Sequence, residues 1–276
     1  MHELALQQRR ELGVRAPWHV GDVTWGLRQH EGREDEWKIR IWKDGDRTVA
    51  WSWLKGDHPG GALLDFDVRR DRLDLLDEIL AEPDARTTVA FEDDDEVRAA
   101  LLRNGFTEED EADVTRQGSV LRFLARDLTD APEPPSLPEG FSCRTVEPDD
   151  LAERVAIHRD VWAPSRVTET SFANVQASWP YRASLDCVVE APDGRFAAYC
   201  LIWPDDENRV GELEPVGVRD EFRRRGLGAA VCTFALRRLH EESGRQAIVY
   251  CVTDAACGLY ESIGFRRHAT LVGYSR

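Results

Sequence analysis

The sequence predicts an α/β (α+β) fold of two tandem domains, each with a mixed, mostly antiparallel sheet flanked by helices. Three observations predict it. Strand patterns alternate with helix patterns along the 276 residues, a proline-rich segment interrupts them, and the order of elements before that segment is repeated after it. The interruption reads APEPPSLPEG at residues 131–140, and its four prolines make a stiff, extended spacer. We therefore predict a first domain over residues 1–130 and a second over residues 141–276.

The second domain is predicted element by element. Acidic residues in the first turn favour a helix at 147–162, and Thr168 or Thr170 is a suitable cap for the next helix. Asp193-Gly194 is typical of a hairpin turn, and Gly244 ends a long helix. The predicted order is a strand at 141–146, helices at 147–162 and 168–179, strands at 185–190, 195–203 and 210–218, a helix ending near 242, a strand at 246–252, a helix at 254–264 and a strand at 265–276.

The composition argues against several classes of partner. The net charge is −16, of which −13 belongs to residues 1–140. Because phosphate contacts dominate nucleic-acid affinity, we expect no nucleic-acid partner, and the field of the molecule favours cationic partners. No run of 18 apolar residues predicts a membrane helix, and the segment MHELALQQRR lacks the apolar core of a signal peptide. We expect a cytoplasmic protein with no membrane partner.

The cysteines predict neither a metal site nor a disulfide framework. All of them lie in the second half, none in a Cys-x-x-Cys pair, and most within apolar runs. We expect buried, reduced thiols and no metal, because a zinc site needs tighter Cys and His spacing. The residues concerned are Cys143, Cys187, Cys200, Cys232, Cys251 and Cys257.

One loop has the pattern of an anion site. The segment EFRRRGLGAAV, residues 221–231, places three arginines directly before Gly226-Leu227-Gly228 at a predicted helix start. Glycines allow the backbone to approach a ligand, the first amides of a helix are unpaired, and the helix dipole attracts anions. The arginines add charge-assisted hydrogen bonds, so the loop predicts a pyrophosphate site. A tight turn with solvated charges is the alternative reading, since GxxxxGK[ST] and GxGxxG are both absent.

The strand before this loop contains candidate catalytic carboxylates. Glu212 and Glu214 flank Leu213, so both point to one face of the strand. Neighbouring carboxylates raise each other's pKa, which brings one closer to the pH at which it accepts a proton from an amine. Salt bridges to arginines, or a water chain acting as the base, are the alternatives. Pro215 has no N–H group and indicates an edge, a bulge or a splay in this strand.

The loop, together with LYESIGF at 259–265, resembles the GNAT N-acetyltransferases, and the resemblance covers residues 141–276 in element order. It implies acetyl-CoA as the co-substrate and Tyr260 as the acid that protonates the departing thiolate. In position Glu212 matches the general-base glutamate of some members, and the resemblance implies that the strands splay near Pro215 to admit the cofactor. Thr253 replaces an asparagine found in many members. The implied cofactor-binding residues are Val216, Gly217, Val218, Arg223, Arg224, Arg225, Gly226, Leu227, Gly228, Ala229 and Thr253.

The acceptor side is less clearly indicated. In the resembling family the first two helices and their loop shape the acceptor pocket. Aromatic walls with nearby glutamates suit a cationic amine, although core packing explains the tryptophans equally well and His158 fits a structural role. The candidates in this segment are His158, Trp162, Ser165, Arg166, Phe172, Trp179 and Tyr181, of which His158, Trp162, Trp179 and Tyr181 are the predicted substrate-binding residues.

The first half repeats the second in a degenerate form. RTVAWSWL at 47–54 aligns with RFAAYCLI at 195–202, and VRAALLRNGF at 97–106 aligns with ACGLYESIGF at 256–265. The loop is replaced by VRRDRLDLLDEIL, whose Asp71 and Asp74 would repel phosphate, and Leu101 stands in place of the tyrosine. We predict a non-catalytic GNAT-like domain with a shortened or missing helix pair. We expect it to pack on the second domain, and its tryptophans to fill the core and the domain contact.

The resemblance implies a function with alternatives. It predicts an acetyl-CoA-dependent N-acetyltransferase that acts on a primary amine of a small molecule or peptide by direct attack in a ternary complex, as a monomer or homodimer. The degenerate first domain suggests instead an acyl-CoA-binding regulatory or sensor protein without turnover. The size, the tandem layout and the excess of Arg over Lys are similar to those of mycothiol synthases, which also leaves an acetyltransferase of bacterial thiol biosynthesis open.

Overall fold

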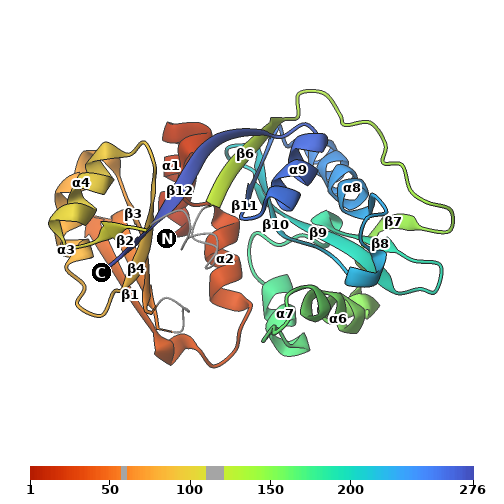
Figure 1. Ribbon diagram of the computed structural model, residues 1–276, viewed down its shortest axis with the longest axis horizontal. Coiled ribbons are helices and arrows are strands. Elements are labelled where there is room, and N and C mark those ends of the chain that lie inside the picture. The colour runs from red at the N-terminus through yellow and green to blue at the C-terminus, as the bar shows by residue number, and fades with distance from the viewer. Residues whose placement is uncertain (57–60, 110–120) are drawn as a thin grey trace.

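The first half folds as two helices followed by a strand-rich unit (Figure 1). The computed structural model describes residues 1–56, 61–109 and 121–276. In chain order the first half contains α1 (His2–Leu12), α2 (Val20–Arg28), β1 (Trp37–Asp44), β2 (Arg47–Lys55), β3 (Leu63–Val68), α3 (Leu76–Leu80), β4 (Thr87–Phe91), α4 (Asp95–Arg103), β5 (Thr107–Glu108) and β6 (Leu121–Asp127). The side chain of His19 caps α2 and the side chain of Asp94 caps α4.

The second half follows the predicted order of elements. It contains β7 (Ser142–Thr145), α6 (Leu151–Val161), α7 (Glu169–Gln176), β8 (Asp186–Glu190), β9 (Phe196–Asp205), β10 (Val210–Val218), α8 (Leu227–Glu241), β11 (Gln246–Cys251), α9 (Asp254–Ser262) and β12 (Arg266–Ser275). The hydroxyl of Thr168 accepts the amide of Ser171 at 3.0 Å and caps α7. Gly194, at φ 82°, lies in the hairpin turn between β8 and β9. Within the described residues, no helix combines the length and apolarity needed to cross a bilayer.

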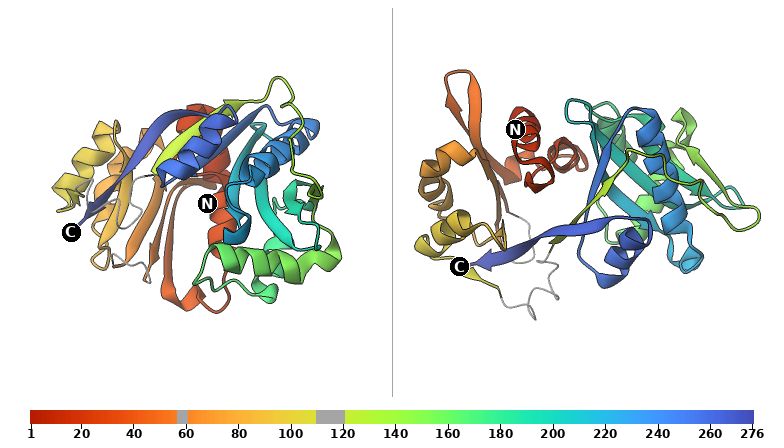
Figure 2. Two further views of the ribbon diagram at one scale, coloured as in Figure 1. Left: turned by 45° about the vertical axis from the view of Figure 1, so that its right-hand side comes forward. Right: turned by 90° about the horizontal axis from the view of Figure 1, so that it is seen from above.

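The two halves exchange strands within one continuous sheet. The order among the described residues is β1-β2-β3-β4-β12-β6-β11-β10-β9-β8-β7, with β5 paired to β12. β6 comes from the first half, yet it lies antiparallel between β11 and β12 of the second. The end of β12 continues into the first half and pairs with β4, as the view from above shows (Figure 2). The predicted boundary at 131–140 separates the two halves along the sequence. In the folded sheet, however, β6 pairs with strands of the second half and β12 pairs with a strand of the first.

The duplication predicted from the sequence is visible in the strand pairing. β2 and β3 pair antiparallel as β9 and β10 do, and β3 meets β4 in parallel as β10 meets β11. The prediction of two mixed, mostly antiparallel units is confirmed.

The prediction of a shortened or missing first helix pair is wrong, because α1 and α2 precede β1 as α6 and α7 precede β8. Helix α2 contains Gly21 and Gly26, and glycine has a low helix propensity, so the local sequence does not predict this helix. At Gly21, a Cβ would lie 2.4 Å from Cγ of Trp203, so tertiary packing requires the glycine.

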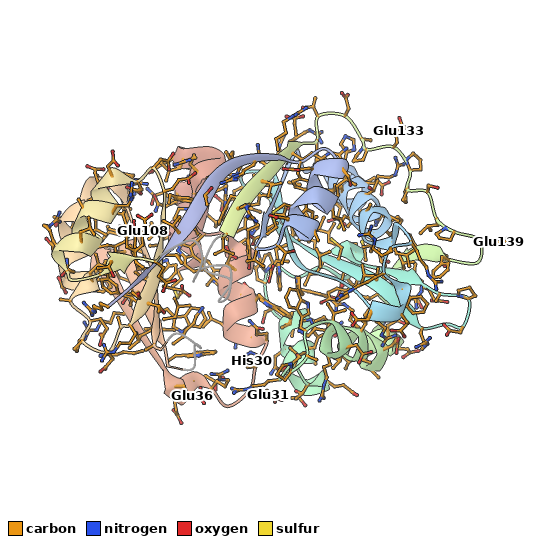
Figure 3. The ribbon with its side chains drawn as sticks, viewed as in Figure 1. His30, Glu31, Glu36, Glu108, Glu133 and Glu139 are labelled. Carbon is orange, nitrogen blue, oxygen red and sulfur yellow. A yellow bond between two sulfur atoms is a disulfide. The ribbon has the colours of Figure 1, made fainter. Side chains whose placement is uncertain are left out.

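Helix α2 packs on the sheet of the second half and holds the halves together. The ring of Trp25 lies edge-on to His158, with 5.4 Å between centroids, and belongs to one buried cluster with Trp203. Beyond the end of α2, the carboxylate of Glu31 accepts the hydroxyl of Thr168 at 2.7 Å. Figure 3 labels His30 and Glu31 at this junction, near α7. Tryptophans of the first half thus serve the domain contact, as predicted, and Trp51 and Trp53 are buried in its own core.

One cysteine pair departs from the prediction of reduced thiols. Cys251 ends β11 and Cys257 lies on α9, and the two form a disulfide. The turn from strand to helix brings their Cα atoms to 5.6 Å, within the range a disulfide needs. The other four cysteines are free, and all but Cys143 are buried.

Candidate active site

The arginine–glycine loop lies between β10 and α8, where the sequence placed it. Gly226 is left-handed, at φ 78° and ψ 1°, and is the N-cap of α8 without any side-chain hydrogen bond to the helix. Arg224 is also left-handed, at φ 64°, a conformation that costs energy for a residue with a Cβ. The side chains of residues 223–225 are exposed, and Arg223 pairs with Asp220 at 2.9 Å. The uncapped first turn of α8 and the neighbouring guanidinium groups form an arrangement that suits an anion.

Gly228 sets how closely α8 approaches its neighbours. A Cβ at this position would lie 2.6 Å from Cδ1 of Leu259 on α9 and 3.3 Å from Cγ2 of Val218 on β10. A Cβ on Gly217 would lie 2.7 Å from Cε1 of Tyr199. Both glycines therefore have packing roles beside the cofactor contacts that the resemblance implies.

β10 stops pairing with β11 after Glu212, before the second candidate base, Glu214. The two strands pair in parallel only over Val210–Glu212 and 246–248 in the described chain. On its other side β10 stays paired with β9, with an irregularity between Leu213 and Val216 and a cis peptide before Pro215. The splay predicted from Pro215 is therefore confirmed. It leaves the β11-facing edge of β10 without a strand partner from this point on.

Glu214 lies at this splay and faces a cavity between the halves. Its side chain is half-buried and lines that cavity together with Tyr250 and Asp22. Burial, and then the nearby charges of Glu212 and Asp22, raise the pKa of Glu214 to about 8, although a hydrogen bond from Tyr250 opposes this shift. A carboxylate with this pKa is a strong enough base to accept a proton from an amine near neutral pH.

Glu212 has a different environment although it shares a strand face with Glu214. It is 2% exposed, and its Oε2 atom lies 3.2 Å from Nδ1 of His19. Burial raises the pKa of Glu212 to about 7 against the opposing effect of Arg9 and of hydrogen bonds from Asp22. Burial also lowers the pKa of His19 to about 3, so the imidazole is neutral and its contact with Glu212 is not an ion pair. Glu212 is thus held inside the domain contact, and Glu214 is the carboxylate that reaches the cavity.

The cavity has a volume of about 700 Å³, within the usual range for small-molecule sites. Both halves of the chain contribute to its walls, and it extends from the splay of β10 and β11 to the gap between β3 and β4. Its aromatic lining consists of Trp18, Trp25, Phe66, Phe91, Phe123, Trp162 and Tyr250. The first half therefore forms part of the chamber into which Glu214 projects.

The predicted acceptor residues divide into two groups. His158 and Trp162 line the cavity and both bond the Tyr199 hydroxyl, at 3.0 and 2.7 Å. Burial, then Arg154, lowers the pKa of His158 to about 3, so it is neutral. Trp179 and Tyr181 are not among the residues that line the cavity. The exposed ring of Trp179 packs edge-on against His2, and Tyr181 donates its hydroxyl to Asp186 at 3.2 Å.

Tyr260 lies on α9 in the core of the second half. It is 7% exposed and packs against Phe265, with 5.8 Å between ring centroids. Burial raises its pKa well above the ordinary value, so the phenol keeps its proton and can donate it. Thr253 accepts the amide of Ala256 at 3.2 Å and caps the same helix. The role of Thr253 seen in the structure is therefore to start the helix that carries Tyr260.

Asp22 and Tyr250 were missed by the sequence reasoning, although both line the cavity beside Glu214. In the sequence, Asp22 resembles an ordinary first-turn acid of a helix, and Tyr250 resembles an apolar strand residue. The signal that places them at the site is tertiary, because α2 and β11 meet there only in the folded chain.

In the corresponding loop of the first half, the arginines form ion pairs with aspartates. Arg69 bonds Asp71 at 2.8 Å, and Arg70 bonds Asp94 at 2.5 Å. Both of these arginines are paired with carboxylates, whereas among the three arginines before Gly226 only Arg223 forms an ion pair within the described residues, with Asp220. The loss of a phosphate loop from the first half stays a prediction.

A comparison with family models assigns the second half. Residues 154–265 match the model described as Acetyltransferase (GNAT) family. This segment, less than half of the chain, is similar to GNAT acetyltransferase domains. The match spans the predicted acceptor helices, the splayed strand, the glycine loop and the helix with Tyr260.

Similar curated proteins are named mycothiol acetyltransferases. The one from Streptomyces coelicolor is 32% identical over 163 residues, which cover 56% of this chain and 52% of the relative. The one from Thermobispora bispora is 29% identical over 257 residues, which cover 84% and 81%. The chain therefore spans about half the length of the Streptomyces relative.

Solved structures similar to this one extend over both halves. A tandem GNAT protein from the clavulanic acid biosynthesis pathway superposes with a TM-score of 0.68 at 18% identity, covering 99% of this chain and 93% of its own. A GCN5-related N-acetyltransferase from Sphaerobacter thermophilus gives a TM-score of 0.65 at 17% identity, covering 100% and 90%. At these identities the likeness concerns the fold alone, and it agrees with two tandem GNAT-like units.

Proposed function

We propose that this chain transfers an acetyl group from acetyl-CoA to a primary amine of a small molecule or peptide bound in the cavity between its halves. One observation carries the proposal. Glu214 faces the cavity from β10, the same strand that leads into the uncapped helix start at Gly226. A base and an anion-binding turn thus lie at the two ends of a short open strand edge.

The residues present fit the co-substrate at two places. The amides of the first turn of α8 and the arginines 223–225 suit a pyrophosphate. Along 216–218, β10 pairs with β9 on one side, and alternate amides of a strand point to its opposite sides. An amide that faces the open side can donate to a thioester carbonyl, and such a donor is typically worth on the order of 3 kcal/mol in the transition state.

Acetyl-CoA would supply the acetyl thioester. The acceptor nitrogen forms the new C–N bond as the C–S bond breaks, in one ternary complex. Glu214 accepts the proton that the nitrogen loses, and Tyr260 donates a proton to the departing sulfur. Burial, and then the neighbouring Glu212 and Asp22, keep the pKa of Glu214 high.

The test is thiol release from acetyl-CoA in the presence of a panel of primary amines and amino-terminal peptides. We expect release that depends on one class of amine, and its loss in Glu214→Gln. Binding of acetyl-CoA without release for any amine would contradict the transferase proposal and favour an acyl-CoA sensor.

A second, narrower candidate is supported by the relatives. Their name, mycothiol acetyltransferase, and the 84% of this chain covered by the Thermobispora bispora relative favour a thiol-biosynthetic acceptor. The direct test is the cysteinyl glucosamine-inositol acceptor in the same assay. A kcat/KM for it well above that of simple amines would support this candidate, and parity with simple amines would contradict it.

A further inference from the structure

The cavity continues into a polar recess in the first half. β3 and β4 pair in parallel only at Leu63 and Thr87 in the described chain, and diverge beyond this point. Gln8 of α1 and Asp67 of β3 line the cavity where the strands have separated. The Nε2 group of Gln8 donates to Oδ1 of Asp67 at 2.5 Å and to the carbonyl of Val68 at 3.1 Å. We call this pair, Gln8 and Asp67, the acidic recess.

Two acceptor atoms of the acidic recess have no partner. Oε1 of Gln8 and Oδ2 of Asp67 are buried and make no hydrogen bond within the described residues. Each of the two residues is 2% exposed, and both line the cavity. Buried polar atoms are nearly always hydrogen-bonded, and an unsatisfied one is costly. A ligand that brings hydrogen-bond donors would satisfy both oxygens.

The charge of the recess favours a cationic donor. The other charged side chains in this part of the wall are paired: Lys55 with Asp65 at 2.5 Å, and Arg70 with Asp94 at 2.5 Å. Asp67 forms no ion pair within the described residues. Burial raises its pKa to about 7, while hydrogen bonds from Gln8 and from the backbone of Val68, and then the charges of Arg70 and the amino terminus, oppose that shift. A cation bound there would stabilise the ionised form, because opposite charge favours it.

We propose that the acidic recess binds a second ammonium group of an elongated acceptor whose reacting amine faces Glu214, so that the acceptor is a diamine or polyamine. This inference rests on the proposed acetyl transfer and gives it a substrate class. An ammonium group carries three donors, enough for both free oxygens. Trp18 and Phe66 line the same cavity, and aromatic walls suit a methylene chain.

The test is calorimetric titration with spermidine in the absence of acetyl-CoA. We expect Asp67→Asn to weaken binding at least tenfold, and Gln8→Met to weaken it too. The matched control is Asp65→Asn, two residues away on the same strand, whose carboxylate is already engaged by Lys55. It should change binding less than threefold. Thermal unfolding of each variant checks that the fold is kept.

Three results would overturn the recess proposal. They are equal spermidine affinity in Asp67→Asn and wild type, equal losses in Asp67→Asn and Asp65→Asn, or binding of the neutral sugar trehalose in place of spermidine. The last result would mean that hydroxyl groups supply the donors.

Turnover separates this inference from the proposed function. Acetylation of spermidine with a KM raised in Asp67→Asn, and with an unchanged KM for the monoamine butylamine, would support both. Spermidine binding that depends on Asp67 without any acetyl transfer would retain the recess and remove the transferase. Acetylation of spermidine with kinetics unchanged in Asp67→Asn would retain the transferase and remove the recess.

Discussion

At the residue scale, two glutamates on one strand face have different environments. Glu212 is enclosed by His19 and Asp22 of the first half, whereas Glu214 reaches the cavity. The sequence predicted that one of the two serves as base but left the choice open. The choice depends on which carboxylate α2 covers, and α2 belongs to the other half of the chain. That information is tertiary and has no local sequence signal.

Glu214→Gln tests the assignment of the base. We expect kcat/KM to fall by about 10²- to 10³-fold, because a positioned base contributes factors of this order. In the wild type, the rate should rise with pH and level off above about 8, since Glu214 accepts protons only when ionised. The variant should lose this rise. A pH profile that is unchanged in Glu214→Gln would contradict the assignment.

Tyr260→Phe tests the proposed acid. The ring stays in the core and only the hydroxyl is lost, so the thermal midpoint should change little, whereas kcat should fall by roughly 10²-fold. Steady-state kinetics with a saturating amine would measure this. Wild-type turnover in the variant would exclude Tyr260 from the mechanism.

At the element scale, the helix starts determine the site. α8 begins at an uncapped glycine and α9 begins at a capping threonine, and Gly228 lets the two helices touch. The sequence predicted both helices, the loop and the hairpin correctly because glycine and cap residues act locally. It failed on α2 and on the disulfide between Cys251 and Cys257, because both depend on distant packing or on a strand-to-helix turn.

Gly228→Val tests the helix contact. The added side chain would collide with Leu259, so α8 should shift and acetyl-CoA affinity should fall at least tenfold, as measured by calorimetry. Gly258→Ala on α9 is the matched control, because a Cβ there meets nothing within 4 Å. The control should bind normally and gain about 0.5–1 kcal/mol of stability from helix propensity. Equal binding by both variants would refute the packing role of Gly228.

At the scale of the whole molecule, the exchanged strands make the halves interdependent. A fragment of residues 141–276 lacks β6, which leaves β11 without its antiparallel neighbour. We expect this fragment to aggregate or stay unfolded, because an exposed edge promotes association. A fragment of residues 121–276 regains β6 and should be more soluble. Size-exclusion chromatography and circular dichroism compare them, and a stable, monomeric 141–276 fragment would contradict the argument.

The buried carboxyl groups predict how stability depends on pH. The pKa values of Glu212 and Asp67 are raised to about 7, and that of Glu214 to about 8. Ionisation of these groups therefore opposes folding. Their contribution to the free energy of unfolding is full below the unfolded pKa near 4, and it is lost as the pH rises through 7 to 8. The pKa values of His19 and His158 are lowered to about 3. These two groups make the free energy of unfolding rise with pH, but only below about pH 6.5, the pKa of an unfolded histidine.

We therefore expect the thermal midpoint to fall between pH 6.5 and 8.5, and to fall less in Glu214→Gln. Each group contributes at most about 1.4 kcal/mol per pH unit. Scanning calorimetry across this range measures the slope. A midpoint that rises with pH over the same range would contradict the sign.

The sequence alone supported the tandem architecture, since alternating patterns and a repeated element order are carried by the chain itself. It did not predict the strand exchange, because β6 and β12 have ordinary strand patterns whichever half they join. The sequence also did not predict the cavity, because Asp22, Asp67 and Glu214 meet around one chamber only through the packing of α1 and α2. The first half, expected to pack on the second, contributes walls to the chamber in the structure.

Calorimetric titration of the full chain with acetyl-CoA tests the central claim most directly. We expect one site per chain, because the helix start at Gly226 is uncapped and flanked by exposed arginines, while Arg69 and Arg70 in the first half are paired with acids. The site should disappear in Gly228→Glu. Two sites per chain would contradict the loss of the first-half loop, and the absence of binding would contradict acetyl-CoA as the co-substrate.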